Sequence, residues 1–381
     1  MTLTCQKHLF SLDKDTIYLN GAYMSPMLKS VEQTGIEGML QKRSPNNVAT
    51  NSFFEGSDKL RSSFSQLING QNPNDCAIIA SVSYGIATVA NNINLSKKDE
   101  ILMVNEQFPS NYYSWDVLAK KTGATIKVVS ASENEPRGKS WNENILNSIT
   151  PQTKVVTMPH VHWADGTKFD LEAIREATNN VGAYLIIDGT QSVGALPFDI
   201  QKIQPDALIC AGYKWLLGPY SIGMAYFGER LQGGTPIEEN WINRLDSEDF
   251  AGLVNYESQY LPGSLRYEVG EHSNFILTPM LNTSIEQLNS WTPEAIQNYC
   301  KAISQPAIDK LSENGFIIEK ESYRSSHLFG IRVGDKNVEQ IKLKLEAENI
   351  YVSIRGNAIR VSPNVYNTEE DINALAECLL K

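Results

Sequence analysis

Two residues that could carry chemistry stand 26 positions apart, Asp188 and Lys214. Each follows an apolar run typical of a buried strand, Tyr184–Asp188 and Ala207–Ala211. A lysine amine held among apolar and aromatic neighbours has a lowered pKa and can act as a neutral nucleophile. A carboxylate beyond the carboxyl end of a strand stands where open α/β sheets bind ligands. The two positions therefore predict a reaction centre that combines a nucleophilic amine with an acid.

Taken alone, each of these residues has an ordinary structural interpretation. A strand-end aspartate such as Asp188 is more often the cap of a turn or helix, and a lysine before a tryptophan is usually a surface group. The pair is harder to explain in this way. Pyridoxal 5′-phosphate (PLP) needs a lysine for its Schiff base and an acid that keeps its ring nitrogen protonated. An aspartate and Lys214 on neighbouring strands would meet across one flat ring, which predicts a PLP site.

The elements that must position this pair form a repeating pattern between residues 53 and 228. Apolar runs alternate there with helical patterns, which predicts an α/β domain with a mostly parallel sheet. The expected strands are Cys76–Ala80, Ile101–Val104, Thr125–Val129, Val155–Met158, Tyr184–Asp188, Ala207–Ala211 and Gly223–Phe227. The expected helices include Gly85–Asn94, Asn111–Lys121 and Asp170–Asn179.

The pattern changes after the sheet-forming stretch. Residues 233–270 have mixed polarity and little periodicity, which indicates a long excursion, either a surface structure or an arm toward a partner. Helical patterns follow at 279–290 and 293–314, and then two strand-helix passages at 328–348 and 351–380. We therefore expect an N-terminal segment (1–25) packed near the small domain, a large domain (26–278) and a small α+β domain (279–381).

Composition limits the possible partners. The net charge of -11 and the absence of a basic patch argue against binding to nucleic acid or anionic membranes. No segment has the apolar length of a bilayer span, and the first residues do not form a secretory signal. The five cysteines include no CxxC pair, so neither a disulfide framework nor a metal site is expected. These features predict a cytoplasmic protein with reduced thiols.

The run IDGTQSVGALPFDI…PDALICAGYKWLLGPYSIGMAYF resembles the class V aminotransferase family of fold-type I PLP enzymes. That family includes cysteine desulfurases, selenocysteine lyases, isopenicillin N epimerase-like proteins and kynureninases. The resemblance extends over nearly the whole chain, from YLNGAYMSP to IRVSPNVYNTEEDINAL. It implies an α/β fold with a seven-stranded, mostly parallel sheet in the large domain and a small C-terminal α+β domain.

The resemblance also implies roles around the ring of the cofactor. Lys214 would form the internal aldimine with PLP and move the proton at the substrate Cα, and Asp188 would pair with the pyridine nitrogen. Gln191 would hydrogen-bond the phenolic oxygen. Phe108 matches the position that stacks on the ring, often histidine in desulfurases, and an aromatic side chain suits that contact. A core phenylalanine before a proline turn is the alternative for Phe108.

For the phosphate, the matching positions are Ser83 and Tyr84, where a helix opens after a strand. Free N–H groups and the helix dipole suit an anion there, although a serine before a helix is usually only an N-cap. Tyr213 matches a residue, often histidine, that reaches the phosphate. The loop that contains His272 and Ser273 resembles one that family members contribute from the other subunit. The resemblance therefore implies a homodimer with a shared active site, without deciding between His272 and Ser273.

Substrate ligands are implied at three further positions. Arg360 matches the arginine that binds the α-carboxylate, and a planar guanidinium suits that group. A surface ion pair is the alternative for Arg360, and Arg355 is a nearby competitor for its role. His162 and Trp163 replace the Ser-Asn of desulfurases, so His162 or Asp165 could set specificity or act as an acid or base. A structural role for His162 is the alternative.

The stretch 352–360, where desulfurases carry a nucleophilic cysteine, contains none, which argues against desulfuration through a persulfide on the protein. We expect a PLP-dependent enzyme that acts on a small amino acid, with an aminotransferase ranked ahead of a lyase or epimerase. A non-catalytic scaffold is the alternative from another class, but a scaffold has no need of the lysine, the aspartate, the glutamine and the arginine together. No GxGxxG or GxxxxGK[ST] motif supports a nucleotide-dependent enzyme.

Overall fold

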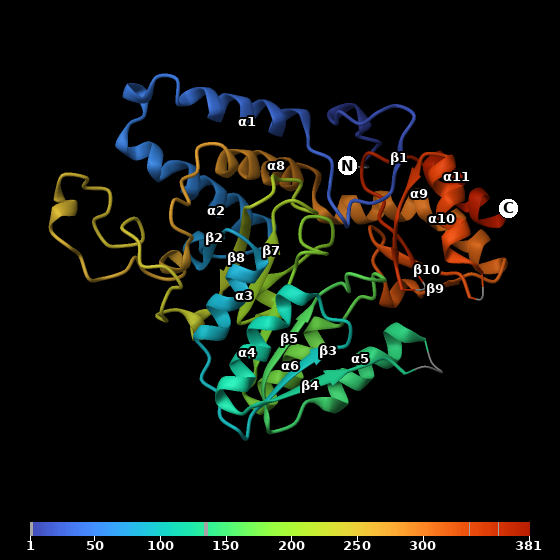
Figure 1. The fold of residues 1–381 in the computed structure, drawn as a ribbon, viewed down its shortest axis with the longest axis horizontal. Helices are drawn as coiled ribbons and strands as arrows, with labels where there is room; N and C mark the ends of the chain where they lie inside the picture. Colours follow the sequence, from blue (N-terminus) through green and yellow to red (C-terminus); the bar gives the residue numbers. More distant parts are fainter. Residues whose placement is uncertain (1–2, 133–135, 335, 357) are drawn as a thin grey trace.

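The computed structural model describes residues 3–132, 136–334, 336–356 and 358–381. A seven-stranded sheet with helices on both faces forms the larger part of the molecule, and a four-stranded sheet with its own helices lies at one end (Figure 1). Within the described residues, no helix is both long enough and apolar enough to cross a membrane.

The large sheet is parallel except at one strand. β8 runs antiparallel to both of its neighbours, β2 and β7, and the remaining adjacent pairs are parallel. This confirms the expected α/β class and mostly parallel sheet. The strand order is β2 (Cys76–Ile79), β8 (Gly223–Phe227), β7 (Ala207–Ala211), β6 (Tyr184–Asp188), β5 (Thr153–Pro159), β3 (Glu100–Val104) and β4 (Thr125–Val129).

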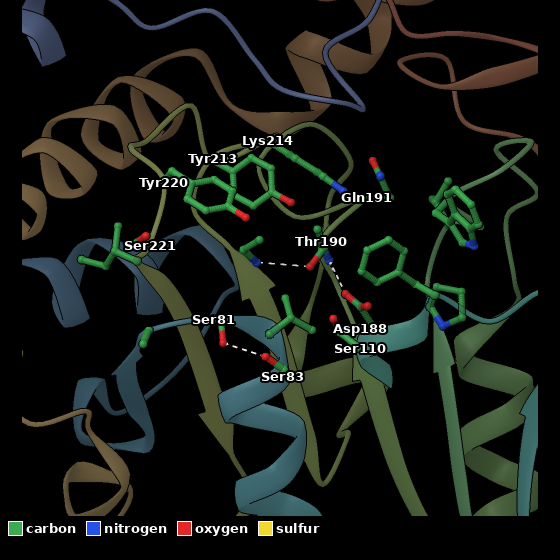
Figure 2. A pocket seen from close by; sticks show the side chains of 18 of the residues that line it. Ser81, Ser83, Ser110, Asp188, Thr190, Gln191, Tyr213, Lys214, Tyr220 and Ser221 are labelled. Carbon is green, nitrogen blue, oxygen red and sulfur yellow. Dashed lines mark hydrogen bonds between the residues drawn. The ribbon is translucent and has the colours of Figure 1, made fainter. Parts of the chain in front are cut away.

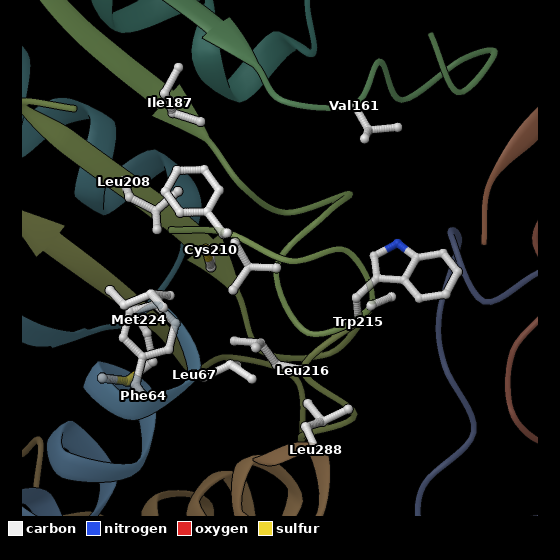
Figure 3. Packing of buried hydrophobic residues seen from close by; sticks show 14 of the residues in the cluster. Phe64, Leu67, Val161, Ile187, Leu208, Cys210, Trp215, Leu216, Met224 and Leu288 are labelled. Carbon is white, nitrogen blue, oxygen red and sulfur yellow. The ribbon is translucent and has the colours of Figure 1, made fainter. Parts of the chain in front are cut away.

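Alternating side chains on the strands feed two apolar cores. On β6, Leu185 and Ile187 enter one core and Ile186 enters the other, as the two-residue period of a strand requires. The first core also holds Phe64, Leu208, Trp215 and Leu216, as Figure 3 shows. Because both faces are covered, the strands are continuous apolar runs, which is why their positions can be predicted from sequence.

Helices from distant parts of the chain cover these faces. One face receives α1, α2, α5, α6 and α8, and the other receives α3 and α4. The bounds are α1 (Lys29–Gln41), α2 (Glu55–Leu67), α3 (Val82–Asn91), α4 (Tyr113–Thr122), α5 (Arg137–Ser148), α6 (Leu171–Val181), α7 (Ile200–Ile203) and α8 (Leu277–Trp291). Helices α1, α2 and α5 were not among the helices predicted from sequence.

Helix α3 begins three residues before the predicted start at Gly85. The side chain of Ser81 accepts a hydrogen bond from the backbone N–H of Tyr84, which caps the helix and allows it to begin at Val82. The first turn of α3 therefore follows directly from the end of β2. This brings the N-terminus of α3 to the carboxyl edge of the sheet.

The smaller sheet belongs to the C-terminal part of the chain. Its order is β12 (Ser353–Arg355), β13 (Ala358–Val361), β10 (Phe329–Arg332) and β9 (Ile317–Ile318), and α9 (Pro293–Glu313), α10 (Val338–Ala347) and α11 (Glu369–Leu380) pack against it. Strand β1 (Ile17–Tyr18) pairs in parallel with β11 (Ile350–Tyr351). The N-terminal segment thus joins the C-terminal part of the fold, as Figure 1 also shows.

Helix α8 packs on α1 and α2, and its buried side chains belong to the core of the large sheet. The predicted domain boundary at residues 278/279 falls inside α8 and would assign most of this helix to the small domain. That boundary stays a prediction. Residues 233–270 contain short 3-10 turns and one isolated bridge, between Arg244 and Tyr260, within a loop that projects from the body (Figure 1).

Candidate active site

A cavity of about 260 Å³ opens at the carboxyl edge of the large sheet. It lies beyond the ends of β5, β6 and β7, at the place where parallel α/β sheets bind ligands (Figure 2). Seven of the predicted site residues line it: Ser83, Phe108, Trp163, Asp188, Gln191, Tyr213 and Lys214. The other predicted residues, which do not line it, are Tyr84, His162, His272, Ser273 and Arg360.

Asp188 ends β6 and presents its carboxylate to the floor of this cavity (Figure 2). Its Oδ1 accepts a 3.0 Å hydrogen bond from the backbone N–H of Thr190. Burial raises the pKa of Asp188, while the bonds from Thr190 and the charge of Lys214 act in the opposite direction. The hydroxyl of Thr190 in turn accepts from the N–H of Ala211, so the ends of β6 and β7 are tied together.

Lys214 follows the end of β7 by three residues, and its amine enters the cavity from the side opposite Asp188 (Figure 2). Only 7% of this residue is exposed. Burial lowers the pKa of Lys214 to about 8, the charge of Asp188 opposes this shift, and the charges of Arg360 and Arg355 add to it. The structure thus supplies the apolar setting that the sequence predicted for a nucleophilic amine.

Aromatic rings form one wall. The amine of Lys214 lies 5.4 Å from the centre of the Phe108 ring and 5.5 Å from that of Tyr213. The Phe108 ring packs edge-on against Trp163, with centroids 5.6 Å apart. The indole N–H of Trp163 donates a 2.7 Å hydrogen bond to the carbonyl of Glu106, which fixes this wall.

Gln191 is held at both ends of its side-chain amide. Its Nε2 donates to the carbonyl of Ala22 at 3.0 Å, and its Oε1 accepts from the indole N–H of Trp215 at 2.9 Å. A primary amide carries two N–H groups, so one remains for a ligand in the cavity. The N-terminal segment and the residue after Lys214 together set its orientation.

The N-terminus of α3 forms another side of the cavity. Ser81 and Ser83 line it, with their hydroxyl oxygens 2.9 Å apart (Figure 2). Free N–H groups and the helix dipole favour an anion at such a position. Tyr84 does not share it, because its side chain lies outside the cavity lining and its backbone N–H is bound by Ser81.

Arg360 lies behind the aromatic wall on β13 and is only 2% exposed. It donates to the carbonyl of Trp163 at 2.7 Å and to the hydroxyl of Ser353 at 3.2 Å. Its Nε has no hydrogen-bond partner among the described residues. Burial, and then the charge of Arg355, lowers the pKa of Arg360 to about 9. A buried guanidinium without a carboxylate is costly, so a site of this kind favours an anionic ligand.

The structure does not bring His162 to the cavity, in contrast to the expectation from sequence. Pro159, Val161 and Trp163 line the cavity, and His162 points the other way, as the alternation of an extended segment requires. Its Nδ1 lies 3.3 Å from Asp165, and its ring lies 4.8 Å from that of Trp141. These contacts give His162 a structural environment.

His272 is also turned away from this cavity. Its Nδ1 is hydrogen-bonded to Ser57 at 2.7 Å, its Nε2 lies 3.4 Å from Glu268, and it is 4% exposed. Ser273 is half-buried and does not line the cavity either. Contribution of this loop to a second subunit stays a prediction, and of the two residues Ser273 is the more accessible.

The contributors to the site that were missed from sequence include Thr190, Trp215, the carbonyl of Ala22 and Ser110, which lines the cavity. Thr190 and Trp215 adjoin the Asp188 and Lys214 motifs, so their proximity was a usable signal. Ala22 offered none, because its role depends on a backbone carbonyl that any residue could supply.

Comparison with known proteins gives matches across the chain. The family model for aminotransferase class V matches residues 41–375. An uncharacterized aminotransferase, YcbU of Bacillus subtilis, is 25% identical over 84% of this chain and 81% of its own length. A probable cysteine desulfurase of Halalkalibacterium halodurans is 27% identical over 88% of this chain and 83% of its own.

Solved structures share the fold at lower identity. A mutant of C-DES with glycine covalently linked to its PLP cofactor superposes with a TM-score of 0.84, at 20% identity, and covers 99% of each chain. The cystine C-S lyase C-DES in complex with its reaction product, cysteine persulfide, gives a TM-score of 0.83 at 21% identity over 96% of this chain and 97% of that one.

Proposed function

Because this chain belongs to the class V aminotransferase family of PLP-dependent enzymes, we propose that Lys214 holds PLP covalently and that the enzyme acts on a small amino acid. One observation carries the proposal. The buried amine of Lys214 and the carboxylate of Asp188 enter one cavity of about 260 Å³ from opposite sides (Figure 2). A PLP site needs both groups at the two ends of one ring.

The residues of the cavity fit this cofactor. Lys214 provides an amine with a pKa of about 8, and Asp188 provides a buried acid. Phe108 provides an aromatic face, and the remaining N–H of Gln191 can donate to a phenolic oxygen. The first turn of α3, with Ser83, provides donors for a phosphate. Their chemistry supports the proposal that the cavity holds an aromatic aldehyde phosphate.

In the proposed chemistry, the amine of Lys214 would hold the cofactor covalently, and Asp188 would accept a hydrogen bond from its ring nitrogen. When bound, PLP would supply an electron sink that stabilises negative charge at the substrate Cα. The amine of Lys214 would move the proton at that Cα. Arg360 holds the α-carboxylate through parallel hydrogen bonds, so that the bond to be broken is oriented.

Transfer of the amino group is the first candidate reaction, in keeping with the relative named as an aminotransferase. A lyase is the second. Two similarities favour a lyase: some relatives are named as cysteine desulfurases, and the similar structure C-DES is named as a cystine C-S lyase. Strand β12 ends at Arg355 and β13 begins at Ala358, so the connection is short and its sequence contains no cysteine. A lyase of this kind would release its sulfur-containing product without a thiol of the protein.

Borohydride reduction tests the covalent bond. The purified enzyme, loaded with PLP, is expected to absorb in the visible region, and mass spectrometry after reduction is expected to find the cofactor on the peptide of Lys214. Lys214→Ala should abolish the adduct. Lys168→Ala is the control, because the pKa of Lys168 is also lowered by burial, while Lys168 is only half-buried and lies outside the cavity lining. A colourless enzyme that takes up no PLP would refute the proposal.

The reaction branch is tested with a panel of amino acids. An aminotransferase requires an added 2-oxo acid acceptor and releases no ammonia. A lyase releases ammonia, with or without acceptor. Racemisation changes only the chirality of the substrate. PLP binding without turnover of any amino acid would favour a scaffold.

A homodimer is also proposed. The loop 233–270 presents exposed apolar side chains, among them Trp241, Val254 and Tyr256, of which Tyr256 is 98% exposed. Phe53, Trp241 and Phe250 pack edge-on into one aromatic cluster at its base. A second copy of the chain would cover this surface. Sedimentation of the holoenzyme is expected to give twice the mass of the chain, and a monomer would refute this part of the proposal.

A further inference from the structure

A second cavity, of about 250 Å³, adjoins the reaction cavity. Trp163 lines both, so its side chain is the wall that they share. Residues from both parts of the fold line this second cavity. The part with the large sheet contributes Glu106, Arg137, Trp163, Ala164 and Asp165, and the part with the small sheet contributes Arg332, Arg355, Gly356 and Ala358. A substrate that extends past Trp163 would reach it.

Charge in the second cavity is unbalanced. Three arginines and two carboxylates line it, which leaves one positive charge in excess among these residues. Asp165 pairs with both Arg137 and Arg332, each at 2.7 Å, and Arg137 also pairs with Glu106 at 3.0 Å. The excess charge therefore belongs to Arg355, in a chain whose net charge is -11.

The guanidinium of Arg355 has donors available to bind an anion. It is half-buried, and among the described residues its Nη1 donates only to the carbonyl of Ile354, at 2.8 Å. Its Nε is buried without a hydrogen-bond partner, and no carboxylate pairs with it, among the residues that the structure describes. The guanidinium lies 5.6 Å from the centre of the Trp163 ring, at the shared wall.

A second arginine that forms no ion pair with the described residues lies nearby. Arg360 donates to the backbone carbonyl of Trp163, and burial, together with the charge of Arg355, lowers the pKa of Arg360. Two guanidinium groups near Trp163 that have no carboxylate partner among the described residues repel each other, at a cost that a ligand with two anionic groups would offset. One carboxylate would bind Arg360, and the other would bind Arg355.

We propose that the second cavity is a subsite for a carboxylate on the substrate side chain, with Arg355 as its ligand. This inference rests on the proposed function and makes it more specific: the preferred substrate is an amino acid with a second carboxylate. Arg355 acts as a specificity residue, and it takes no part in bond breaking. Nε and Nη2 of Arg355 have no hydrogen-bond acceptor in the part of the chain that the structure describes, so they offer the two parallel donors that a carboxylate accepts.

The kinetic test compares acidic amino acids with their amides on the holoenzyme. We expect a higher kcat/KM for glutamate than for glutamine, or for aspartate than for asparagine. Arg355→Gln should lower that ratio about 10- to 100-fold, the range for loss of hydrogen bonds to a charged group. Arg355→Lys should retain part of the ratio. Arg332→Gln is the matched control, because it removes a charge that Asp165 already pairs, and it should change the ratio less.

Equal losses for acidic and neutral substrates in Arg355→Gln would overturn the inference, since Arg355 would then serve the α-carboxylate. A wild-type preference for the amides would overturn it as well.

Calorimetry separates this inference from the proposed function. Glutarate and butyrate differ by one carboxylate, and neither can react as an amino acid. Wild-type protein, with or without PLP, is expected to bind glutarate more tightly, and Arg355→Gln should remove the difference. If no amino acid is turned over, the proposed function fails while this comparison still tests the subsite. Equal binding of the two ligands by wild type would refute the subsite even if Arg355→Gln did not fold.

Discussion

The indole N–H of Trp215 donates a 2.9 Å hydrogen bond to Oε1 of Gln191. The residue beside Lys214 is thereby joined to the residue three positions after Asp188, so the two motifs of the reaction centre are connected inside the protein. The His327 ring packs edge-on against the same indole, with centroids 4.3 Å apart. Its Nε2 is hydrogen-bonded to the backbone carbonyl of Gln191 and not to the side-chain amide.

Trp215→Phe is expected to destabilise the protein by about 1–3 kcal/mol, because the buried Oε1 of Gln191 loses its donor while much of the ring packing is kept. Urea unfolding measures the change, and the rate of PLP loss should rise as Gln191 becomes free to turn. Trp241→Phe is the control, since Trp241 is 40% exposed. Equal effects of the two substitutions would contradict the importance of the bond.

The pH dependence of cofactor attachment follows from the pKa of Lys214. Only the neutral amine attacks the aldehyde, and burial lowers the pKa of this amine from 10.5 to about 8. Attachment of PLP to cofactor-free enzyme should therefore accelerate as pH rises through about 8. Stopped-flow absorbance measures the rate.

Charge variants give the sign of the same effect. Asp188→Asn should move the midpoint to lower pH, because the charge of Asp188 raises the pKa of Lys214. Arg360→Gln should move it to higher pH, because the charge of Arg360 lowers that pKa. A midpoint near 10.5 in wild type would show that the amine is solvated.

Two glycines with positive φ separate backbone strain from steric overlap. Gly182 has φ +72° and an open surrounding, whereas Gly194 has φ +105° and a Cβ there would overlap the carbonyl of Trp215. Gly182→Ala should cost about 1 kcal/mol, from backbone conformation alone. Gly194→Ala should cost more and should also weaken PLP binding, because Trp215 adjoins Lys214. Urea unfolding and PLP titration measure both. Similar losses would contradict the overlap.

Asp165 joins the two parts of the fold. It pairs with Arg137 of α5 and with Arg332 of β10, and it also faces His162. Asp165→Asn is expected to cost about 3–5 kcal/mol of unfolding free energy, the range for breaking a buried pair. Glu172→Gln, which removes an exposed pair with Lys202, should change stability little.

Acid should reduce the effect of Asp165→Asn. His162 and the two arginines lower the pKa of Asp165 in the folded protein, despite its burial. A carboxyl of this kind stabilises the fold above its unfolded pKa, and the stabilisation is lost as pH falls toward its folded pKa. The difference between wild type and Asp165→Asn should thus be largest near neutral pH and should narrow in acid. A constant difference would point to a lost hydrogen bond rather than a lost charge.

The sequence predicted the sheet better than the helices outside it. Tyr184–Asp188 and Ala207–Ala211 are strands with the predicted bounds, because strands covered on both faces must be apolar throughout. Helix α1 buries only Val31 and Gly35 among its mostly polar residues, so its sequence carries a weak pattern. Its position depends on packing against α8, far away in sequence.

Within the site, the residue types predicted the chemistry, but they did not predict which side chains point into the cavity. Lys214 and Asp188 line one cavity as expected, but His162 does not. The two-residue alternation that places Val161 and Trp163 in the cavity also turns His162 away, and this signal was present in the sequence. The environment of Arg355 could not be predicted, because it depends on a cavity built from both parts of the fold.

The N-terminal segment gives the reaction centre an order of assembly. Its carbonyl at Ala22 holds Gln191, and its N–H at Ala22 binds Ser362, which lies 340 positions later in the chain. During synthesis, Ala22 emerges before Ser362, and the segment cannot make this contact until Ser362 has left the ribosome. Contacts of such long sequence separation form late and slowly. The strands of the large sheet, all before residue 228, are thus synthesised well before Ser362, and the nascent chain is expected to hold its cofactor firmly only after Ser362 has emerged.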